Sequence, residues 1–460
     1  MKLENNLDTD HIRELVWKLA FPSMLAQFVS VLYSIVDRMY IGHLAGIGVN
    51  ALAGVGVCGP VVTMIGAFAS LVGVGGAPLA SIAMGEGNND NAGKIIGNAF
   101  DLMMIIAIAV VVLVYPFAEK MLYVFGASET TILYALSYFK IYLLGTPFLL
   151  LATGMNNFIN CQGYARIGMI SVLIGAVTNI ILDPMLMFVF HMGVEGAAMA
   201  SVISQLFSCI FVMTVLLSKH LPVRLKFMGI DIKTCLNILK IGFTQFIIIA
   251  FDNVMIISMN AVLQKYGGEQ LGDVLITVNT IVQSFMLVVT MPLGGISSGT
   301  QCILSYNYGA YQMNRIKEGI RYIAKVCIGY CVLMLAIAWL FGKYFIFLFN
   351  KDAQLVELAQ NALKMVTLFI IPLGLQYEMV DSMTALGQVN ISLPLSFFRK
   401  GVYFVALFLI PVFFSVQYTF AAECISDLIA PIVSFITVKK NLPLILEWRM
   451  SMKEEQKVTE

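Results

Sequence analysis

Long apolar runs alternate with short polar connectors along the whole chain of 460 residues. A transmembrane helix needs about 20 apolar residues, and each of these runs is about that long or longer. The pattern predicts twelve transmembrane helices, at residues 15–41, 50–84, 92–116, 131–160, 167–190, 195–217, 236–263, 273–305, 315–342, 354–386, 391–413 and 418–438. Four of them exceed a straight span and are expected to tilt, kink or project into water.

The composition agrees with this pattern. Hydrophobic residues make up 59% of the chain and charged residues 12%, and the mean hydropathy is +0.86. A soluble domain usually carries about a quarter charged residues. We therefore expect an all-α polytopic membrane protein, and the net charge of +1 gives no sign of a nucleic-acid partner.

The distribution of basic residues predicts the orientation. Most of the 28 lysine and arginine residues fall on the side that holds both termini and the even-numbered connectors. The positive-inside rule makes that side cytoplasmic. The polar first 14 residues do not resemble a cleavable signal. We expect a multi-pass protein of the bacterial cell (inner) membrane with cytoplasmic termini. A basic connector, residues 218–233, separates an N-terminal lobe (1–226) from a C-terminal lobe (227–460).

The two halves resemble copies of each other. At a constant offset of 224 residues, Lys140 falls on Lys364 and Gly163 on Gly387. Ser81 falls on Ser305 at the same offset, and further matches are Gly85 on Gly309, Phe125 on Phe349, Ala197 on Ala421 and Ala198 on Ala422. Six helices in each half give both halves the same orientation. The pattern predicts a parallel repeat, with the substrate expected between the halves.

Polar residues in the N-terminal half form a candidate cation site. An ionisable residue in the hydrocarbon costs roughly 2.5–3.5 kcal/mol on insertion scales, so each one needs a reason. Asn179 and Asp183 are four residues apart on one helix face, and Asp37 and Ser201 are expected at a similar depth. The set could hold a hard monovalent cation or a proton shared by the two carboxyl groups. The structural alternative is that each acid snorkels or pairs with a base such as Arg38.

The second half lacks this set, which favours a functional interpretation. At the 224 offset, Asn179 becomes Tyr403, Asp183 becomes Leu407 and Ser201 becomes Ile425. The second half instead carries other acids: Asp252, Glu378, Asp381, Glu423 and Asp427. For Asp252, Glu378 and Asp381 two hypotheses stay open. They form a second cation site or a counter-charge for a cationic substrate, or they pair with Arg399 or Lys400 near the cytoplasmic side.

Other chemistry finds little support in the sequence. The eight cysteines and four histidines form no ligand pattern, the glycine run at 73–76 lacks a phosphate-binding Lys-Ser/Thr, and no nucleophile–base set stands out. We expect neither an enzyme nor a resident cofactor. Transport would draw on an ion gradient, and the 27 methionines and 31 phenylalanines suit an adaptable apolar pocket.

The motifs of the first half resemble those of the multidrug and toxic compound extrusion (MATE) transporters. These motifs are Asp37-x-x-Tyr40-Ile41-Gly42, Asn179-Ile-Ile-Leu-Asp183-Pro184 and Gly193-x-x-Gly196-Ala197-Ala198, with Gln162-Gly163 and Gly387-Gln388 as further matches. The resemblance covers essentially the whole chain, and the overall pattern is similar to that of the bacterial MepA-like branch.

The resemblance implies a V-shaped fold of two six-helix lobes. It also implies export of amphipathic, often cationic molecules in exchange for Na⁺ or H⁺ by alternating access. Asp37, Asn179, Asp183 and Ser201 match the family's N-terminal cation site, where threonine often stands in place of Ser201. Some members use a glutamate in helix seven and an aspartate in helix ten instead. Here Asp252, Glu378 and Asp381 match that second pattern poorly.

A lipid-linked saccharide flippase of related architecture is the alternative function. Such a protein is expected to line its cavity with several basic residues, and the sequence suggests almost none within the membrane beyond Arg38. The expected partners are a small-molecule substrate and membrane lipid, and the protein is expected to act as a monomer.

Overall fold

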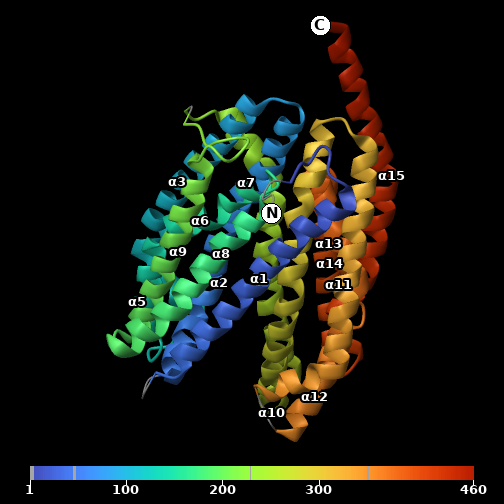
Figure 1. The fold of residues 1–460 in the computed structure, drawn as a ribbon. Coiled ribbons are helices and arrows are strands. Elements are labelled where there is room, and N and C mark those ends of the chain that lie inside the picture. Colours follow the sequence, from blue (N-terminus) through green and yellow to red (C-terminus); the bar gives the residue numbers. More distant parts are fainter. Residues whose placement is uncertain (1–4, 45–47, 228, 350–351, 460) are drawn as a thin grey trace. The chain divides into compact units, whose positions relative to one another are not determined.

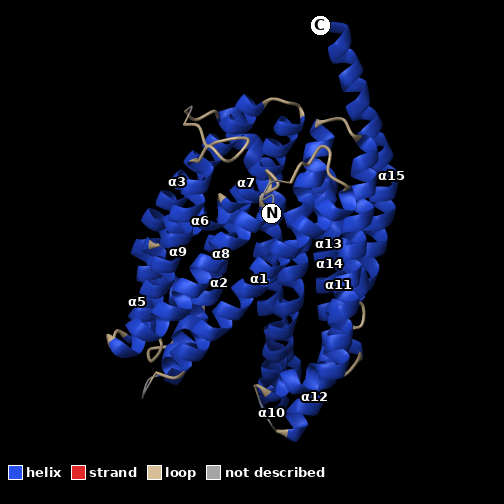
Figure 2. Cartoon of the chain, in the orientation of Figure 1, coloured by secondary structure: helices blue, strands red, loops and turns tan. Residues whose placement is uncertain are grey.

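The computed structural model describes residues 5–44, 48–227, 229–349 and 352–459, and it is built from helices joined by short loops (Figures 1 and 2). In chain order the helices are α1 (Ile12–Gly42), α2 (Gly48–Gly85), α3 (Asn89–Val114), η1 (Tyr115–Phe117), α4 (Ala118–Val124), α5 (Ile132–Leu144), α6 (Thr146–Gly154), α7 (Asn156–Asn160), α8 (Ala165–Pro184), the π-helical turn η2 (Met185–Val189), α9 (Gly193–Leu217), α10 (Ile232–Gly309), α11 (Met313–Phe347), α12 (Ala353–Thr367), α13 (Ile370–Ala385), α14 (Val389–Phe413), η3 (Val416–Phe420) and α15 (Ala421–Thr459).

The membrane-spanning helices match the predicted segments. Among the described residues, ten helices are long and apolar enough to cross a membrane. Two further spans are bent: α5 meets the following helices at 57°, and α12 meets α13 at 45°. Counting each bent pair as one span gives twelve, which confirms the prediction. The long element α10 contains two spans, because Gly268 breaks the helix with a φ of +67°, a conformation that favours glycine.

The last helix is longer than predicted. We expected it to end near residue 438, but α15 continues to Thr459. The prediction was based on where the apolar run ends. That point shows where a helix leaves the hydrocarbon, but the helix itself can continue beyond it. The extension is anchored by Arg449, whose Nε donates to the Tyr308 carbonyl over 3.2 Å and whose guanidinium lies 4.5 Å from the centre of the Tyr311 ring.

The chain divides into two compact units. One contains residues 1–9 and 21–249, and the other contains residues 10–20 and 250–460. Each unit therefore holds most of one predicted lobe plus part of a helix from the other half of the sequence. The start of α1 belongs to the second unit, where Arg315 Nη2 donates to the Asp10 carbonyl over 2.9 Å.

Equivalent positions in the two halves have the same local structure, which supports the repeat. In the first unit, Ser81 Oγ donates to the Cys161 carbonyl over 3.3 Å. In the second unit, Ser305 Oγ donates to the Ala385 carbonyl over 2.8 Å, and both partners are shifted by 224 residues. The glycines at positions 163 and 387 also share a positive φ, of 91° and 71°. An offset that preserves hydrogen bonds and backbone conformation reflects a repeated fold and not a chance recurrence of small residues.

The basic connector between the halves lies against α3 of the first unit. Lys94 Nζ contacts Asp231 Oδ2 at 2.7 Å, and Lys226 Nζ contacts Asp90 Oδ1 at 2.6 Å. The Asp231 backbone N–H also donates to Asn98 Oδ1 over 2.6 Å. The hydrogen bond from Lys94 is the main reason why the pKa of Asp231 falls to about 2. The carboxylate is therefore ionised at neutral pH, and the connector stays attached.

A close crossing in the first unit gives a stability prediction. A Cβ added at Gly242 on α10 would stand 1.7 Å from the carbonyl oxygen of Leu71 on α2, and backbone cannot move aside cheaply. We expect Gly242→Ala to destabilise the protein by roughly 1–3 kcal/mol through overpacking. The measurement is thermal unfolding in detergent. Gly329→Ala on α11 is the matched control, because nothing lies within 4 Å of its added Cβ, and it should leave stability unchanged or slightly raised. Equal effects of the two substitutions would contradict the close crossing.

Candidate functional site

The first two site residues lie on α8. Asn179 and Asp183 are fully buried, at 1% and 0% exposure. Their spacing of one helical turn lets Asn179 Nδ2 donate to Asp183 Oδ1 over 3.2 Å. Pro184 follows directly, and the chain then passes into η2. The apolar sequence of α8 therefore buries one amide and one carboxyl group side by side.

Asp37 reaches the same place from α1. Its carboxyl group is close enough to the carboxyl group of Asp183 for the two to interact directly, although the two residues are far apart in the sequence. The structure thus brings together three of the four residues predicted for the N-terminal cation site. Arg38 is close enough to Asp37 to interact electrostatically, but it does not separate the two acids.

Three oxygen atoms of this group have no protein donor. Asp37 Oδ1, Asn179 Oδ1 and Asp183 Oδ2 are all buried and accept no hydrogen bond among the described residues. Buried oxygens without a donor are costly. A proton shared between the carboxyl groups would satisfy part of the set, and a bound monovalent cation would satisfy all of it. The residues present therefore fit either coupling ion.

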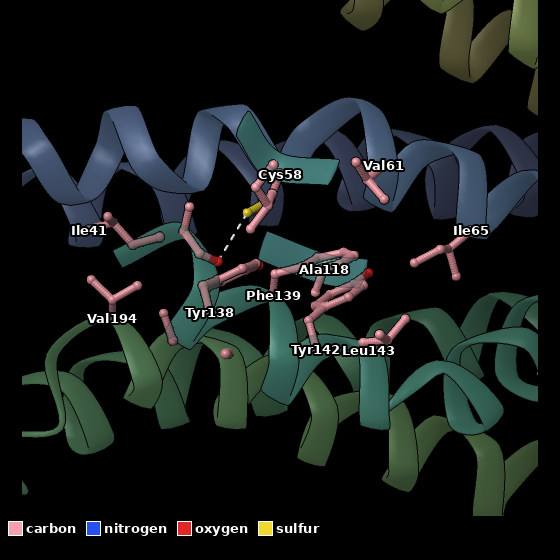
Figure 3. Packing of buried hydrophobic residues seen from close by; sticks show 14 of the residues in the cluster. Ile41, Cys58, Val61, Ile65, Ala118, Tyr138, Phe139, Tyr142, Leu143 and Val194 are labelled. Carbon is pink, nitrogen blue, oxygen red and sulfur yellow. Dashed lines mark hydrogen bonds between the residues drawn. The ribbon is translucent and has the colours of Figure 1, made fainter. Parts of the chain in front are cut away.

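Helix α5 lies beside these acids, since both Tyr138 and Tyr142 interact electrostatically with Asp37. Figure 3 shows how this helix packs against its apolar neighbours. Tyr138, Phe139, Tyr142 and Leu143 pack against α2 at Cys58 and Val61, with Val194 of α9 on the other side. Cys58 Sγ donates to the Ala135 carbonyl over 3.4 Å, which ties α2 to α5. The stacked Tyr138 and Tyr142 rings, 5.8 Å apart, thus sit in a fixed apolar setting.

Ser201, the fourth predicted site residue, is linked to the acids through Tyr138 of α5. Tyr138 interacts with both Ser201 and Asp37. Gln205, one turn further along α9, donates from Nε2 to the Tyr142 hydroxyl over 3.3 Å. Ser201 therefore belongs to a hydroxyl and amide layer beside the carboxyl pair.

Several residues of this layer were not predicted. Tyr33, Tyr138, Tyr142 and Gln205 surround the acids. Tyr33 could have been predicted from the sequence, because it precedes Asp37 by four residues and therefore shares its helix face. The other three lie on α5 and α9, and in one sequence they resemble ordinary residues of a membrane helix.

The second-half candidates have separate partners. Lys400 Nζ donates to Asp252 Oδ1. Ser297 donates to Asp381, and Ser382 Oγ donates to Glu378 Oε1 over 2.6 Å. Pairing with a base is therefore observed for Asp252. Serine hydroxyls donate to both Glu378 and Asp381, and for these two acids both sequence hypotheses stay open.

The expectation that basic residues are almost absent from the membrane is wrong for the second half. Arg399 and Lys400 lie in the middle of α14, which spans Val389–Phe413, and not near either of its ends. Their side chains are 13% and 5% exposed. Arg399 Nε donates to Asp427 Oδ1 over 2.9 Å. The hydropathy of the whole segment gave no sign of two basic residues at this depth, because the surrounding residues are strongly apolar.

The helices and this buried polar group define a polytopic α-helical membrane protein of two repeated halves. The MatE family model matches residues 22–185 and 249–409, and the chain belongs to the MatE family.

Curated relatives support the family over most of the chain. It is 26% identical over 374 residues to the multidrug export protein MepA of Staphylococcus haemolyticus, which covers 80% of each protein. The figures are the same for MepA of Staphylococcus aureus strain MSSA476.

Solved structures show the same fold. An outward-facing multidrug resistance MATE family transporter superposes with a TM-score of 0.89 at 20% identity, covering 96% of this chain and 98% of that one. A transporter of the MOP superfamily from Pyrococcus furiosus also gives a TM-score of 0.89 at 20% identity, with 95% and 97% covered. At this identity the likeness concerns the fold alone.

Proposed function

We propose that the protein is a secondary antiporter that exports amphipathic, often cationic small molecules in exchange for Na⁺ or H⁺. The observation that carries the proposal is the buried carboxyl pair of Asp37 and Asp183, with three oxygens that lack a protein donor. Membership of the MatE family and similarity to multidrug export proteins support the direction of transport and the substrate class.

The carboxyl pair suits an ion that binds and leaves during each cycle. Two carboxylates in contact repel each other unless a proton or a cation lies between them. Loading would hold α1 against α8, and release would let them separate. This gives the ion a different affinity for two arrangements of the first unit, which is the requirement for coupling by alternating access. The ion is transported, so no resident cofactor is needed, and we expect the protein to work as a monomer.

Transport in proteoliposomes tests this function. The wild-type protein would be reconstituted and the flux of tetraphenylphosphonium measured under a Na⁺ gradient alone and under a pH gradient alone. We expect uphill flux under one of the two gradients, and the effective gradient identifies the coupling ion. Flux that follows only the concentration gradient of the organic cation under both conditions would contradict antiport.

A flippase for lipid-linked saccharides is the second candidate, and Arg399 and Lys400 are the observation in its favour. Basic side chains within the membrane could hold a pyrophosphate. Against this, each base already contacts a carboxylate, Asp427 for Arg399 and Asp252 for Lys400. An anionic headgroup would have to compete with both acids. A protein without gradient-driven export of organic cations would favour this candidate.

A further inference from the structure

A network of charged side chains lies within the membrane-spanning part of the second unit. Asp252 is near the middle of the span Ile232–Gly268, and it contacts Lys400 on α14. Arg399, the neighbour of Lys400, contacts Asp427 on α15. One turn before Asp427, Glu423 accepts a hydrogen bond from Gln283 Nε2 over 3.3 Å. The network thus contains two bases and three acids.

The two members of the Asp252–Lys400 pair differ in exposure. The Asp252 side chain is 51% exposed, whereas that of Lys400 is 5% exposed. An exposed carboxylate at this depth cannot face hydrocarbon without a large cost, so this side of α10 must meet water. A molecule that approaches from the water therefore reaches the carboxylate of Asp252 before the ammonium group behind it.

Aromatic rings cluster on the two helices that carry Asp252 and Lys400. Phe251 precedes Asp252 on α10, and its ring lies 5.3 Å from that of Phe397 and 6.4 Å from that of Phe404, both on α14. Phe397 is itself 38% exposed. A carboxylate beside accessible aromatic faces suits an organic cation, because the rings attract its charge and cover its apolar body.

A second acid interacts with Lys400 electrostatically. This acid is Glu423, which also interacts electrostatically with Arg399 and accepts a hydrogen bond from Gln283. Lysine has a flexible four-carbon stem and three rotatable donors. The ammonium group could therefore leave Asp252 and contact Glu423 without becoming an isolated buried charge. Arg399 lacks this freedom, because its partner Asp427 is fully buried.

We propose that Asp252 is the carboxylate that binds the organic cation, and that Lys400 occupies it as an internal cation until the substrate displaces it toward Glu423. This inference rests on the proposed function and specifies its substrate site. It makes Lys400 a competitor of the substrate, so removing the lysine should strengthen the binding of cations. A lysine that merely stabilises the fold, or one that binds anions, would behave differently.

Equilibrium binding to the full-length protein in detergent tests the proposal. Tetraphenylphosphonium and tetraphenylborate have the same size and shape and opposite charge, so they serve as the two probes. We expect Lys400→Gln to tighten the Kd for tetraphenylphosphonium roughly tenfold and to leave tetraphenylborate unchanged or weaker. Asp252→Asn should weaken tetraphenylphosphonium by at least roughly tenfold. Lys364→Gln is the control, an exposed lysine of the same unit on α12.

The double variant Asp252→Asn/Lys400→Gln decides whether the lysine acts through the aspartate. We expect Lys400→Gln to give no gain in affinity in the Asp252→Asn background. Lys400→Met, which keeps an apolar stem, is a second test of the same prediction in case the glutamine variant folds poorly. Unchanged or weaker cation binding in both lysine variants would overturn the proposal, as would tight wild-type binding of tetraphenylborate that is lost with the lysine.

Gradient-driven flux of the wild type separates this proposal from the proposed function. Flux without any gain of affinity in the lysine variants would overturn the role of Lys400 and leave antiport standing. A wild type that neither binds nor transports tetraphenylphosphonium would overturn both.

Discussion

Asp183→Asn is expected to reduce ion-driven efflux on the order of a hundredfold, while the protein still binds the substrate. The amide keeps the size of the side chain and the hydrogen bond with Asn179, but it removes the charge that a coupling ion needs. A loss of this size corresponds to the upper part of the usual range of coupling free energies between two ligands. Asp37→Asn should have the same effect, because each carboxyl group is the partner of the other.

The measurement is efflux of tetraphenylphosphonium from proteoliposomes under the gradient that drives the wild type. Asp273→Asn is the matched control, since it makes the same chemical change at an exposed aspartate of α10 and should leave efflux unchanged. The variant Asp37→Asn/Asp183→Asn should be no worse than either single variant, because the pair acts as one site. Independent, multiplying losses would show that the two acids serve different steps, and wild-type efflux in both single variants would rule out the site.

The carboxyl pair could be predicted because its signals are local and chemically rare. Asn179 and Asp183 are one helical turn apart in an otherwise apolar run, and depth counted from the helix ends places Asp37 at the same level. The cost of an ionisable residue in hydrocarbon makes such a coincidence informative. The twelve spans were predictable for the same reason, since their apolar length is set by the bilayer.

The remaining features depend on tertiary structure. Nothing in the run around Tyr138 and Tyr142 distinguishes them from other aromatic residues of a membrane helix, and only the packing of α5 against α9 gives them partners. Arg399 and Lys400 were assigned to the wrong depth, because a basic pair near a predicted helix start usually lies at the interface. Acids from α10 and α15, distant in sequence, are what let these bases lie in the middle of a span.

Arg399→Met is expected to destabilise the second unit by about 3–5 kcal/mol, the usual cost of leaving one member of a buried ion pair without its partner. Asp427 is fully buried, and its Oδ2 already lacks a hydrogen bond among the described residues. Without the guanidinium group, the carboxylate would keep, among the described residues, only the 3.5 Å hydrogen bond from the Ser426 hydroxyl. A fall in melting temperature of roughly 5–10 °C in detergent should follow.

The double variant Arg399→Met/Asp427→Leu tests whether the loss comes from the unpaired charge. Two apolar side chains of similar volume avoid the cost of burying ions, so the double variant should recover most of the lost stability. Lys364→Met is the control for removing a basic residue from the same unit, because that lysine is exposed, and it should leave the melting temperature unchanged. A double variant as unstable as the single one would mean that Arg399 stabilises the unit through packing of its stem, and the ion pair would then be incidental to the fold.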